Sequence, residues 1–345
     1  MADYTPKSRH HPGEVVTLAH GGGGTRMRWL LEEVIFPGLG EQGLSKAEDA
    51  ALLDLPPGQA AFTTDTFVVT PLFFPGGDIG KLAVCGTVND LAMRGATPLF
   101  LSVGMVLEEG LALETLRTLA GSLGYWAKKA GVRLVTGDTK VVERGKADGI
   151  YINTSGLGVV APGRGVSISG ASPGDVLLIS GPLGDHGSAV LARREGFSFQ
   201  EGLDSDCAPL SGLVEAMLDA GRVTALRDLT RGGLAAACTE MALASGCSLE
   251  LEETGIPVRR SVRAFCEMLG LDPLLVACEG RLLAAVEARD AGRVLEAMRL
   301  HPLGSGSATA GSVVDGRTGE VTLVTPMGTR RFLRMPSGEQ LPRIC

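Results

Sequence analysis

Residues 63–96 read TTDTFVVTPLFFPGGDIGKLAVCGTVNDLAMRGA, and the fold expected for the chain is built outward from this stretch. Its first part belongs to an apolar and β-branched run, Gln59 to Thr70, which predicts a strand. Two prolines and two glycines in PLFFPGGD interrupt that strand. Apolar residues then recur on one helical face, at positions 79, 82, 83, 88, 91 and 92. This spacing predicts a helix from Ile79 to Arg94.

The residues that follow predict further strands and helices in alternation. Strands are expected at Leu99–Leu107, at Val132–Thr136 and up to about Val160, with a helix at Leu113–Ala130 between the first two. The order β–α–β–α–β–β is typical of a mixed α+β domain. After APGRG at 161–165 the pattern restarts, with strands at Val176–Ser180, Ser248–Leu251, Leu282–Val286, Gly311–Val314 and Glu320–Val324, and helices at His186–Arg194, Leu210–Ala220, Gly232–Ala244, Arg259–Leu269 and Ala291–Leu300.

The chain is therefore expected to have four parts and an α+β fold. Its 345 residues fit two domains at roughly 150 residues each. We place these domains at 41–162 and 163–330, after an N-terminal segment, 1–40, that contains the loop HGGGG at 20–24. Residues 331–345 have no periodicity and predict a mobile tail that carries Cys345.

Composition and charge exclude several classes of protein. The formal charge is −7 and there is no run of Lys or Arg, so the electrostatic footprint of a nucleic-acid-binding protein is missing. No apolar run approaches the ~20 residues needed to cross a bilayer. The first 16 residues lack the apolar core of a signal peptide. We expect a cytoplasmic protein with neither a nucleic-acid nor a membrane partner.

Seven cysteines are present, and Cys345 differs from the others. The odd count and the absence of a CxxC pair argue against a disulfide framework and a zinc site. Most of the cysteines have apolar neighbours and are expected to be buried, whereas Cys345 follows the polar stretch PSGEQLPR and is expected to be exposed. Arg343 would favour a reactive thiolate and a terminal carboxylate would oppose it. An end without any role remains the alternative.

A series of aspartates beside small residues is the second candidate for chemistry. A hard cation such as Mg²⁺ takes oxygen ligands, usually from a few carboxylates and nucleotide phosphates. Short carboxylates next to glycine suit this, because the backbone comes close to the phosphates. The alternative is that each caps a turn or a helix. Asp90 favours function, because an Asp inside an apolar helix costs up to ~0.7 kcal/mol in propensity. The series comprises Asp65, Asp78, Asp90, Asp138 and Asp228.

Other motifs leave two interpretations open. Lys81 and Lys140, in GGDIGK and GDTK, could neutralise phosphate or could be solvated surface lysines. HGGGG could be a linker or could fold its N–H groups around an anion. His186, in GDHG, could be catalytic or could belong to a turn or the core. The phosphate-cradling pattern GxxxxGK[ST] is absent.

Several motifs accompany residues 63–96 along the chain: HGGGG, LEEG, VTGDTKVVERGKADGIYINTSGLG, GDHG, DLTRGGL and the terminal PRIC. With these motifs the chain, from about residue 15 to the last residue, resembles the HypE family of hydrogenase maturation factors. HypE proteins are carbamoyl dehydratases and belong with the ATP-binding synthetases typified by aminoimidazole ribonucleotide synthetase and selenophosphate synthetase. There are two mild departures: HGGGG stands where HGSGG is usual, and DLTRGGL lacks the Pro that often follows its Asp.

The resemblance implies a function and a set of partners. A carbamoyltransferase, HypF, would place a carboxamide on the sulfur of Cys345. ATP would phosphorylate the amide oxygen, and loss of phosphate would leave a thiocyanate. The cyano group would pass to iron held by a HypC–HypD complex and destined for [NiFe]-hydrogenase. The implied fold is two domains of the aminoimidazole ribonucleotide synthetase type, with the first domains of a homodimer pairing their sheets.

The resemblance also implies roles for individual residues, with ATP and Mg²⁺ as cofactors. The predicted catalytic residues are Cys345, Glu279 as the base, Lys140 and Asp90. Nucleotide binding is assigned to Asp65, Asp78, Lys81, Asn89, Gly137 and Asp138, and metal binding to Asp65, Asp90, Asp228 and Asp49.

Two other functions remain possible on the sequence alone. A small-molecule kinase of the selenophosphate synthetase or thiamine-phosphate kinase type would use the same aspartates and leave Cys345 idle. A scaffold that only docks maturation partners would need neither the aspartates nor Cys345 for catalysis.

Overall fold

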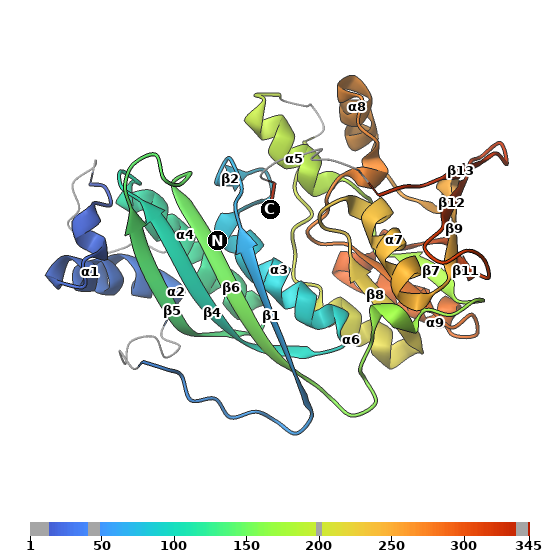
Figure 1. The fold of residues 1–345 in the computed structure, drawn as a ribbon, viewed down its shortest axis with the longest axis horizontal. Coiled ribbons are helices and arrows are strands. Elements are labelled where there is room, and N and C mark those ends of the chain that lie inside the picture. Colours follow the sequence, from blue (N-terminus) through green and yellow to red (C-terminus); the bar gives the residue numbers. More distant parts are fainter. Residues whose placement is uncertain (1–13, 41–48, 198–201, 336–343) are drawn as a thin grey trace.

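A computed structural model describes residues 14–40, 49–197, 202–335 and 344–345. The chain forms two α+β units that lie side by side (Figure 1). Residues 63–96 form the centre of the first unit. Its helix, α3 (Ile79–Met93), is buried along almost its whole length because it lies between the sheet of its own unit and the second unit.

The first unit is a four-stranded sheet in the order β1-β6-β4-β5. Helices α3 and α4 (Leu113–Lys129) cover one face, and no described element covers the other (Figure 1). β1 pairs with β6 and β6 with β4 in antiparallel fashion, while β4 and β5 are parallel. The strands are β1 (Gln59–Phe67), β6 (Ile150–Val160), β4 (Thr97–Glu108) and β5 (Arg133–Val142).

Short elements complete the first unit. The N-terminal segment consists of α1 (Thr25–Leu30), a π-helical turn (Leu31–Ile35) and α2 (Phe36–Leu39), and it packs against α4. This packing requires glycine, because a Cβ on Gly124 of α4 would lie 2.1 Å from the carbonyl oxygen of Gly38. A two-residue pair, β2 (Phe73–Phe74) and β3 (Gly77–Asp78), leads into α3.

The second unit is a seven-stranded sheet in the order β13-β12-β9-β11-β7-β10-β8. Apolar side chains of α6 and α9 share one core with this sheet, and those of α7 share another. The strands are β7 (Val176–Ile179), β8 (Val223–Asp228), β9 (Ser248–Glu252), β10 (Leu282–Val286), β11 (Ala308–Val314), β12 (Val321–Val324) and β13 (Arg330–Phe332), and the helices are α5 (Asp185–Arg194), α6 (Ser211–Ala220), α7 (Gly233–Ser245), α8 (Arg260–Leu269) and α9 (Ala291–Leu300).

Contacts of α3 join the two units. Ala92 and Met93, at its end, belong to the core formed by α6, α9 and the second sheet. One turn earlier, the side chain of Asn89 donates to the carbonyl oxygens of Ala208 (3.1 Å) and Glu279 (3.2 Å). Its own oxygen accepts the N–H of Leu210 at 2.7 Å. Asn89 thus holds two loops of the second unit against the first.

Most predicted elements are confirmed, with a few differences. The short strands β2 and β3 and the strands β8 and β13 were not expected, and β5 runs to Val142 where the prediction stopped at Thr136. Among the described residues, no helix is long and apolar enough to span a bilayer. The four domain boundaries stay predictions. The mobility of the tail also stays a prediction, because 336–343 lie outside the described residues.

Candidate active site

Four carboxylates contributed by both units meet between them. Asp65 lies on β1, Asp90 near the end of α3, Asp228 at the end of β8, and Glu279 in the loop before β10. Burial, and after it the negative charge of Asp228, raises the pKa of Asp90 to about 6. The hydroxyl of Thr63 donates to Asp90 at 2.9 Å and opposes this shift. The cluster is therefore short of positive charge.

Two carboxylate oxygens in this cluster lack hydrogen bonds. Oδ1 of Asp228 and Oε1 of Glu279 are buried without a hydrogen-bond partner among the described residues, although Nη1 of Arg227 lies 3.7 Å from the former. Burial raises the pKa of both groups, that of Glu279 far above its ordinary value. Buried oxygens of this kind normally bind a donor or a cation. The cluster consequently suits a cationic ligand.

The thiol of Cys345 lies beside these carboxylates. Burial raises its pKa to about 12, and the next cause is the charge of Glu279; Arg231 acts in the opposite direction. Ile344, the preceding residue, is buried in the core of the first unit. Cys345 is only partly exposed, whereas the sequence predicted an exposed thiol. Arg343, which was expected to activate it, lies outside the described residues. The pocket instead favours a neutral group on the sulfur.

The cluster can be tested for its fit to Mg²⁺. Among the described residues, no three His, Cys, Asp or Glu side chains are close enough together to form a complete metal site. Mg²⁺ typically takes only one or two protein carboxylates and completes its shell with phosphates and water, so one or two of Asp65, Asp90 and Asp228 would suffice. Asp49 is exposed and is not among the charges that shift the pKa values of the cluster.

Other predicted nucleotide-binding residues have structural partners in this structure. Oδ1 of Asp78 caps α3 by accepting the N–H of Lys81 (2.9 Å), and it also accepts the hydroxyl of Ser122 (2.7 Å). Nζ of Lys81 donates to the carbonyl oxygen of Gly76 (2.7 Å) and lies 4.3 Å from the ring centre of Trp126. Asn89 is likewise engaged by the loops described above. Asp78 therefore acts as a helix cap, which was the alternative to a role in nucleotide binding.

Asp138 and Lys140 lie on the opposite face of the first sheet from the carboxylate cluster. The register places Asp138 and Gly104 in a row with Asn153 and Thr66, whereas Asp65 is one residue before Thr66 and points to the α3 face. The two residues form an exposed ion pair with N···O distances of 2.6 and 2.8 Å. Gly137 precedes them on the same strand. A shallow depression of about 150 Å³ here is lined by Thr66, Gly104, Met105, Val106, Asp138, Lys140, Tyr151 and Asn153.

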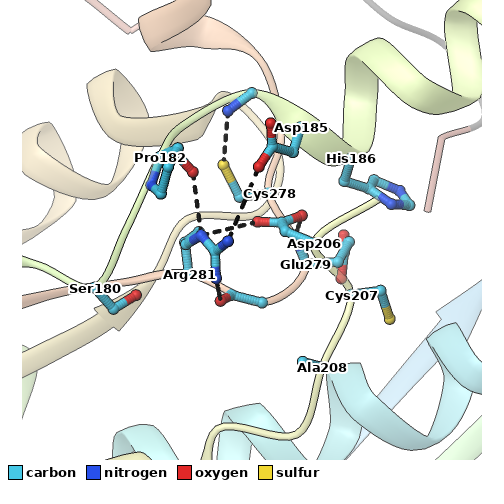
Figure 2. A network of polar contacts seen from close by, with 12 residues as sticks. Ser180, Pro182, Asp185, His186, Asp206, Cys207, Ala208, Cys278, Glu279 and Arg281 are labelled. Atoms are coloured by element: carbon cyan, nitrogen blue, oxygen red, sulfur yellow. Dashed lines mark hydrogen bonds and ion pairs between the residues drawn. The ribbon is translucent and has the colours of Figure 1, made fainter. Parts of the chain in front are cut away.

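A buried network that the sequence did not reveal holds Glu279 in place (Figure 2). The guanidinium of Arg281 lies 3.9 Å from Asp185 and 3.7 Å from Asp206, and it donates to the carbonyl oxygen of Pro182 (3.1 Å). Oδ1 of Asp206 in turn accepts the backbone N–H of Glu279 at 3.1 Å. The position of Glu279 therefore depends on a cation two residues further along the chain.

The comparisons with known proteins agree with this architecture. The models for the N-terminal and C-terminal domains of AIR synthase related proteins match residues 47–160 and 172–324. The chain is 49% identical over 336 residues to the carbamoyl dehydratase HypE of Rhodobacter capsulatus, which covers 96% of this chain and 98% of the relative. It is 50% identical over 331 residues to HypE of Azotobacter vinelandii, with 96% and 97% covered. The chain belongs to the HypE family.

Solved structures of HypE proteins have the same fold. A hydrogenase maturation protein HypE in complex with ATP superimposes with a TM-score of 0.92 at 44% identity, covering 95% of this chain and 99% of that one. HypE from a HypE–HypF complex superimposes with a TM-score of 0.78 at 48% identity, covering 80% and 90%. A thiamine-monophosphate kinase from Stenotrophomonas maltophilia (TM-score 0.63, 90% and 95% covered) shares only the fold at 20% identity, and the kinase alternative is not favoured.

Proposed function

We propose that this HypE protein dehydrates a carboxamide carried on the sulfur of its own Cys345, with ATP, and thereby makes the cyanide ligands of [NiFe]-hydrogenase iron. The observation that carries the proposal is the position of the Cys345 thiol inside the carboxylate cluster, next to Glu279. HypE relatives of about half identity are named carbamoyl dehydratases, and a solved HypE binds ATP, which supports the same activity here.

The chemistry requires activation of a poor leaving group. The amide oxygen of the S-carboxamide attacks the γ-phosphorus of ATP, and ADP leaves. The carbon–oxygen bond then breaks with phosphate as the leaving group while the nitrogen loses two protons, which leaves a carbon–nitrogen triple bond on sulfur. Catalysis of such phosphoryl transfer rests mainly on positioning and on stabilising charge.

The electrostatics of the pocket suit this substrate. The surrounding carboxylates oppose a thiolate on Cys345, but an S-carboxamide is neutral and avoids that penalty. Glu279 is positioned to accept a proton from the nitrogen. Its raised pKa makes its ionised form a stronger base than an exposed glutamate. Arg231, close enough to influence both Cys345 and Asp65, supplies positive charge.

Asp65, Asp90 and Asp228 would hold Mg²⁺, and their deficit of positive charge is the observation that supports this assignment. When bound, the ion would spread the negative charge of the transferring phosphoryl group. The predicted roles in metal or nucleotide binding are less well supported, by position and contacts, for Asp49, Asp78, Lys81 and Asn89.

Lys140, Gly137 and Asp138 remain part of the proposal through a second copy of the chain. Asp138 and Lys140 share the uncovered face of the first sheet with Phe62, whose side chain is 72% exposed, and Gly137 lies beside them on β5. Pairing of two such faces in a homodimer would bury that ring. Sedimentation of the wild type against Phe62→Asp tests this: we expect a dimer that the variant weakens, and a monomeric wild type would refute it.

The assembly in the cell follows from the proposed chemistry. HypF would deliver the carbamoyl group, as the solved complex of a relative with HypF suggests. A HypC–HypD complex would accept the cyano group, and the reaction would take place in the cytoplasm. These partners and this location are expectations from the family.

The decisive experiment is intact-mass spectrometry of the protein with carbamoyl phosphate, ATP and the partner carbamoyltransferase. We expect a gain of one carbamoyl group, followed by an ATP-dependent loss of one water. A Cys345→Ser variant should show neither change. If a variant lacking Cys345 still delivered cyanide to iron, the proposal would fail.

A further inference from the structure

His186, at the start of α5, is completely buried, and both of its ring nitrogens have partners. Nε2 lies 2.6 Å from the carbonyl oxygen of Ile344, and Nδ1 lies 2.8 Å from the hydroxyl of Ser205. The ring meets Phe74 edge-on with 5.4 Å between centroids. These contacts leave the imidazole one orientation, facing the docked chain end.

The partners determine where the protons lie. A carbonyl oxygen only accepts, so Nε2 carries the proton and donates to Ile344. Burial lowers the pKa of His186, so the ring is neutral and Nδ1 is an acceptor. The hydroxyl of Ser205 therefore donates to Nδ1, and its oxygen accepts the N–H of Cys207 at 3.1 Å. The hydrogen bonds run in one direction, from Cys207 through Ser205 and His186 to Ile344.

This chain of hydrogen bonds is anchored to both units. The N–H of Ser205 donates to the carbonyl oxygen of Pro75 at 2.8 Å, in the connection between β2 and β3. The contact is close, because a Cβ on Gly76 would lie 2.7 Å from the backbone of Ser205. His186 itself belongs to the second unit. The imidazole is thus held rigidly at the junction where the chain end enters.

We propose that His186 positions Cys345 for the reaction by holding the carbonyl group of Ile344. That carbonyl belongs to the planar peptide unit that leads into Cys345, so fixing its oxygen also restricts where the next Cα can lie. The sulfur is then kept beside Glu279. His186 bonds to the backbone before the reacting residue and is therefore a positioning residue. The inference rests on the proposed function for its chemical consequence, while the docking contact is independent of it.

Two isosteric substitutions separate the two ring nitrogens. The amide nitrogen of His186→Gln can take the place of Nε2 and keep the donor to Ile344. In His186→Asn the shorter amide reaches only the place of Nδ1, so the bond to Ser205 survives and the bond to Ile344 is lost. Both variants remove the ring. Because His186→Asn keeps the bond to Ser205, a faster release of the chain end in His186→Asn than in His186→Gln reports the loss of the Nε2 donor.

The first readout is the rate at which iodoacetamide alkylates Cys345 in unmodified protein, followed by peptide mapping. Because the docked thiol is only partly exposed, it should react faster when the chain end leaves the pocket. Loss of one buried hydrogen bond should raise that rate about tenfold in His186→Asn. His186→Gln should stay close to the wild type.

The second readout is ATP-dependent loss of water in a single turnover. Cyanate can convert the Cys345 thiol to the S-carboxamide without a partner protein. We expect His186→Asn to dehydrate it more slowly with an unchanged KM for ATP, and His186→Gln to recover most of the rate. A structural role alone would not produce this recovery.

Several results would overturn the proposal: alkylation of Cys345 in His186→Asn at the wild-type rate, or equal acceleration in both variants. If neither variant folds, Ser205→Ala decides, because the His186 ring loses the hydrogen bond at Nδ1 that helps hold its orientation. A smaller increase in alkylation supports the proposal, and no increase overturns it. If carbamoylated wild type fails to lose water, the proposed function is at fault, and the alkylation rates still judge His186.

Discussion

Replacing Arg281 by methionine should destabilise the protein severely and displace Glu279. The guanidinium is 10% exposed and lies between Asp185 and Asp206, two carboxylates that are almost completely buried. It also donates to two backbone carbonyls, those of Pro182 and Gly280. Methionine fills similar space without charge or donors. Among the described residues, the ion pair that remains is between Asp185 and the partially exposed Arg259, at 3.1 Å.

The expected loss in free energy of unfolding is large because one member of a buried ionic group is removed. Such removal costs about 3–5 kcal/mol, since a charge remains buried without compensation. Arg289→Met provides the matched control. Arg289 also pairs with a carboxylate, Glu287 at 2.6 Å, but its side chain is 78% exposed. Exposed pairs contribute about 0–1 kcal/mol, so the control should unfold nearly as the wild type does.

The loss in free energy of unfolding caused by Arg281→Met should grow as pH rises. Burial and the charge of Asp206 already raise the pKa of Asp185 from an ordinary 3.8 to about 6, and Arg281 works against this rise. Without Arg281 the folded-state pKa rises further above the unfolded value. A carboxyl group of this kind stabilises the fold fully below its unfolded pKa, and that contribution is lost as pH rises through the folded pKa. The penalty should be largest near pH 8 and smaller near pH 5.

Urea unfolding of both variants, followed by circular dichroism at pH 8 and pH 5, measures these differences. Dehydration of the S-carboxamide in Arg281→Met should also slow, because Asp206 would no longer hold the backbone of Glu279 in place. Equal losses in the two variants would refute the reasoning. So would a penalty that grows as pH falls.

Three further predictions concern the same pocket. Glu279→Gln should accept the carbamoyl group yet lose ATP-dependent dehydration, as measured by intact mass, because the amide cannot take the proton. Gly280→Ala should lose about 1–3 kcal/mol in urea unfolding, since its Cβ would overlap the carbonyl oxygen of Asp206, whereas Gly121→Ala in α4 has open space and should be neutral or stabilising. Asp90→Asn should raise the melting temperature of nucleotide-free protein at pH 8, because a carboxyl group with a pKa of about 6 is removed, and the gain should vanish below about pH 4.

The elements that could be predicted have strong local patterns. The apolar spacing of α3 and the run LLAAV of β10 match their observed bounds closely. The missed strand β8, VTALRD, has Arg and Asp in its second half and little alternation. β5 was predicted too short because GDTK is polar. It continues as a strand because its backbone pairs with β4 while the side chains of Asp138 and Lys140 face solvent.

Some features of the candidate site could also be predicted from the sequence, and others could not. Carboxylates beside glycine could be recognised in the sequence, and so could the unusual position of Cys345. Sequence could not show that Asp65 and Lys140 point to opposite faces of one sheet, since this follows from the register of four strands. Nor could it indicate that Arg281 compensates Asp185 and Asp206, which are far apart along the chain.

By itself, the amino-acid sequence determined the two α+β units, the family and the set of acidic side chains available for chemistry, because all of these reside in local periodicity and short motifs. Tertiary structure alone decided the ionisation state of the functional side chains. The nearest charged side chain in the sequence, Arg343, would favour a thiolate at Cys345, yet burial beside Glu279 raises the pKa of the thiol to about 12. A pKa depends on desolvation and on charges brought close through space, and both arise only when the two units come together.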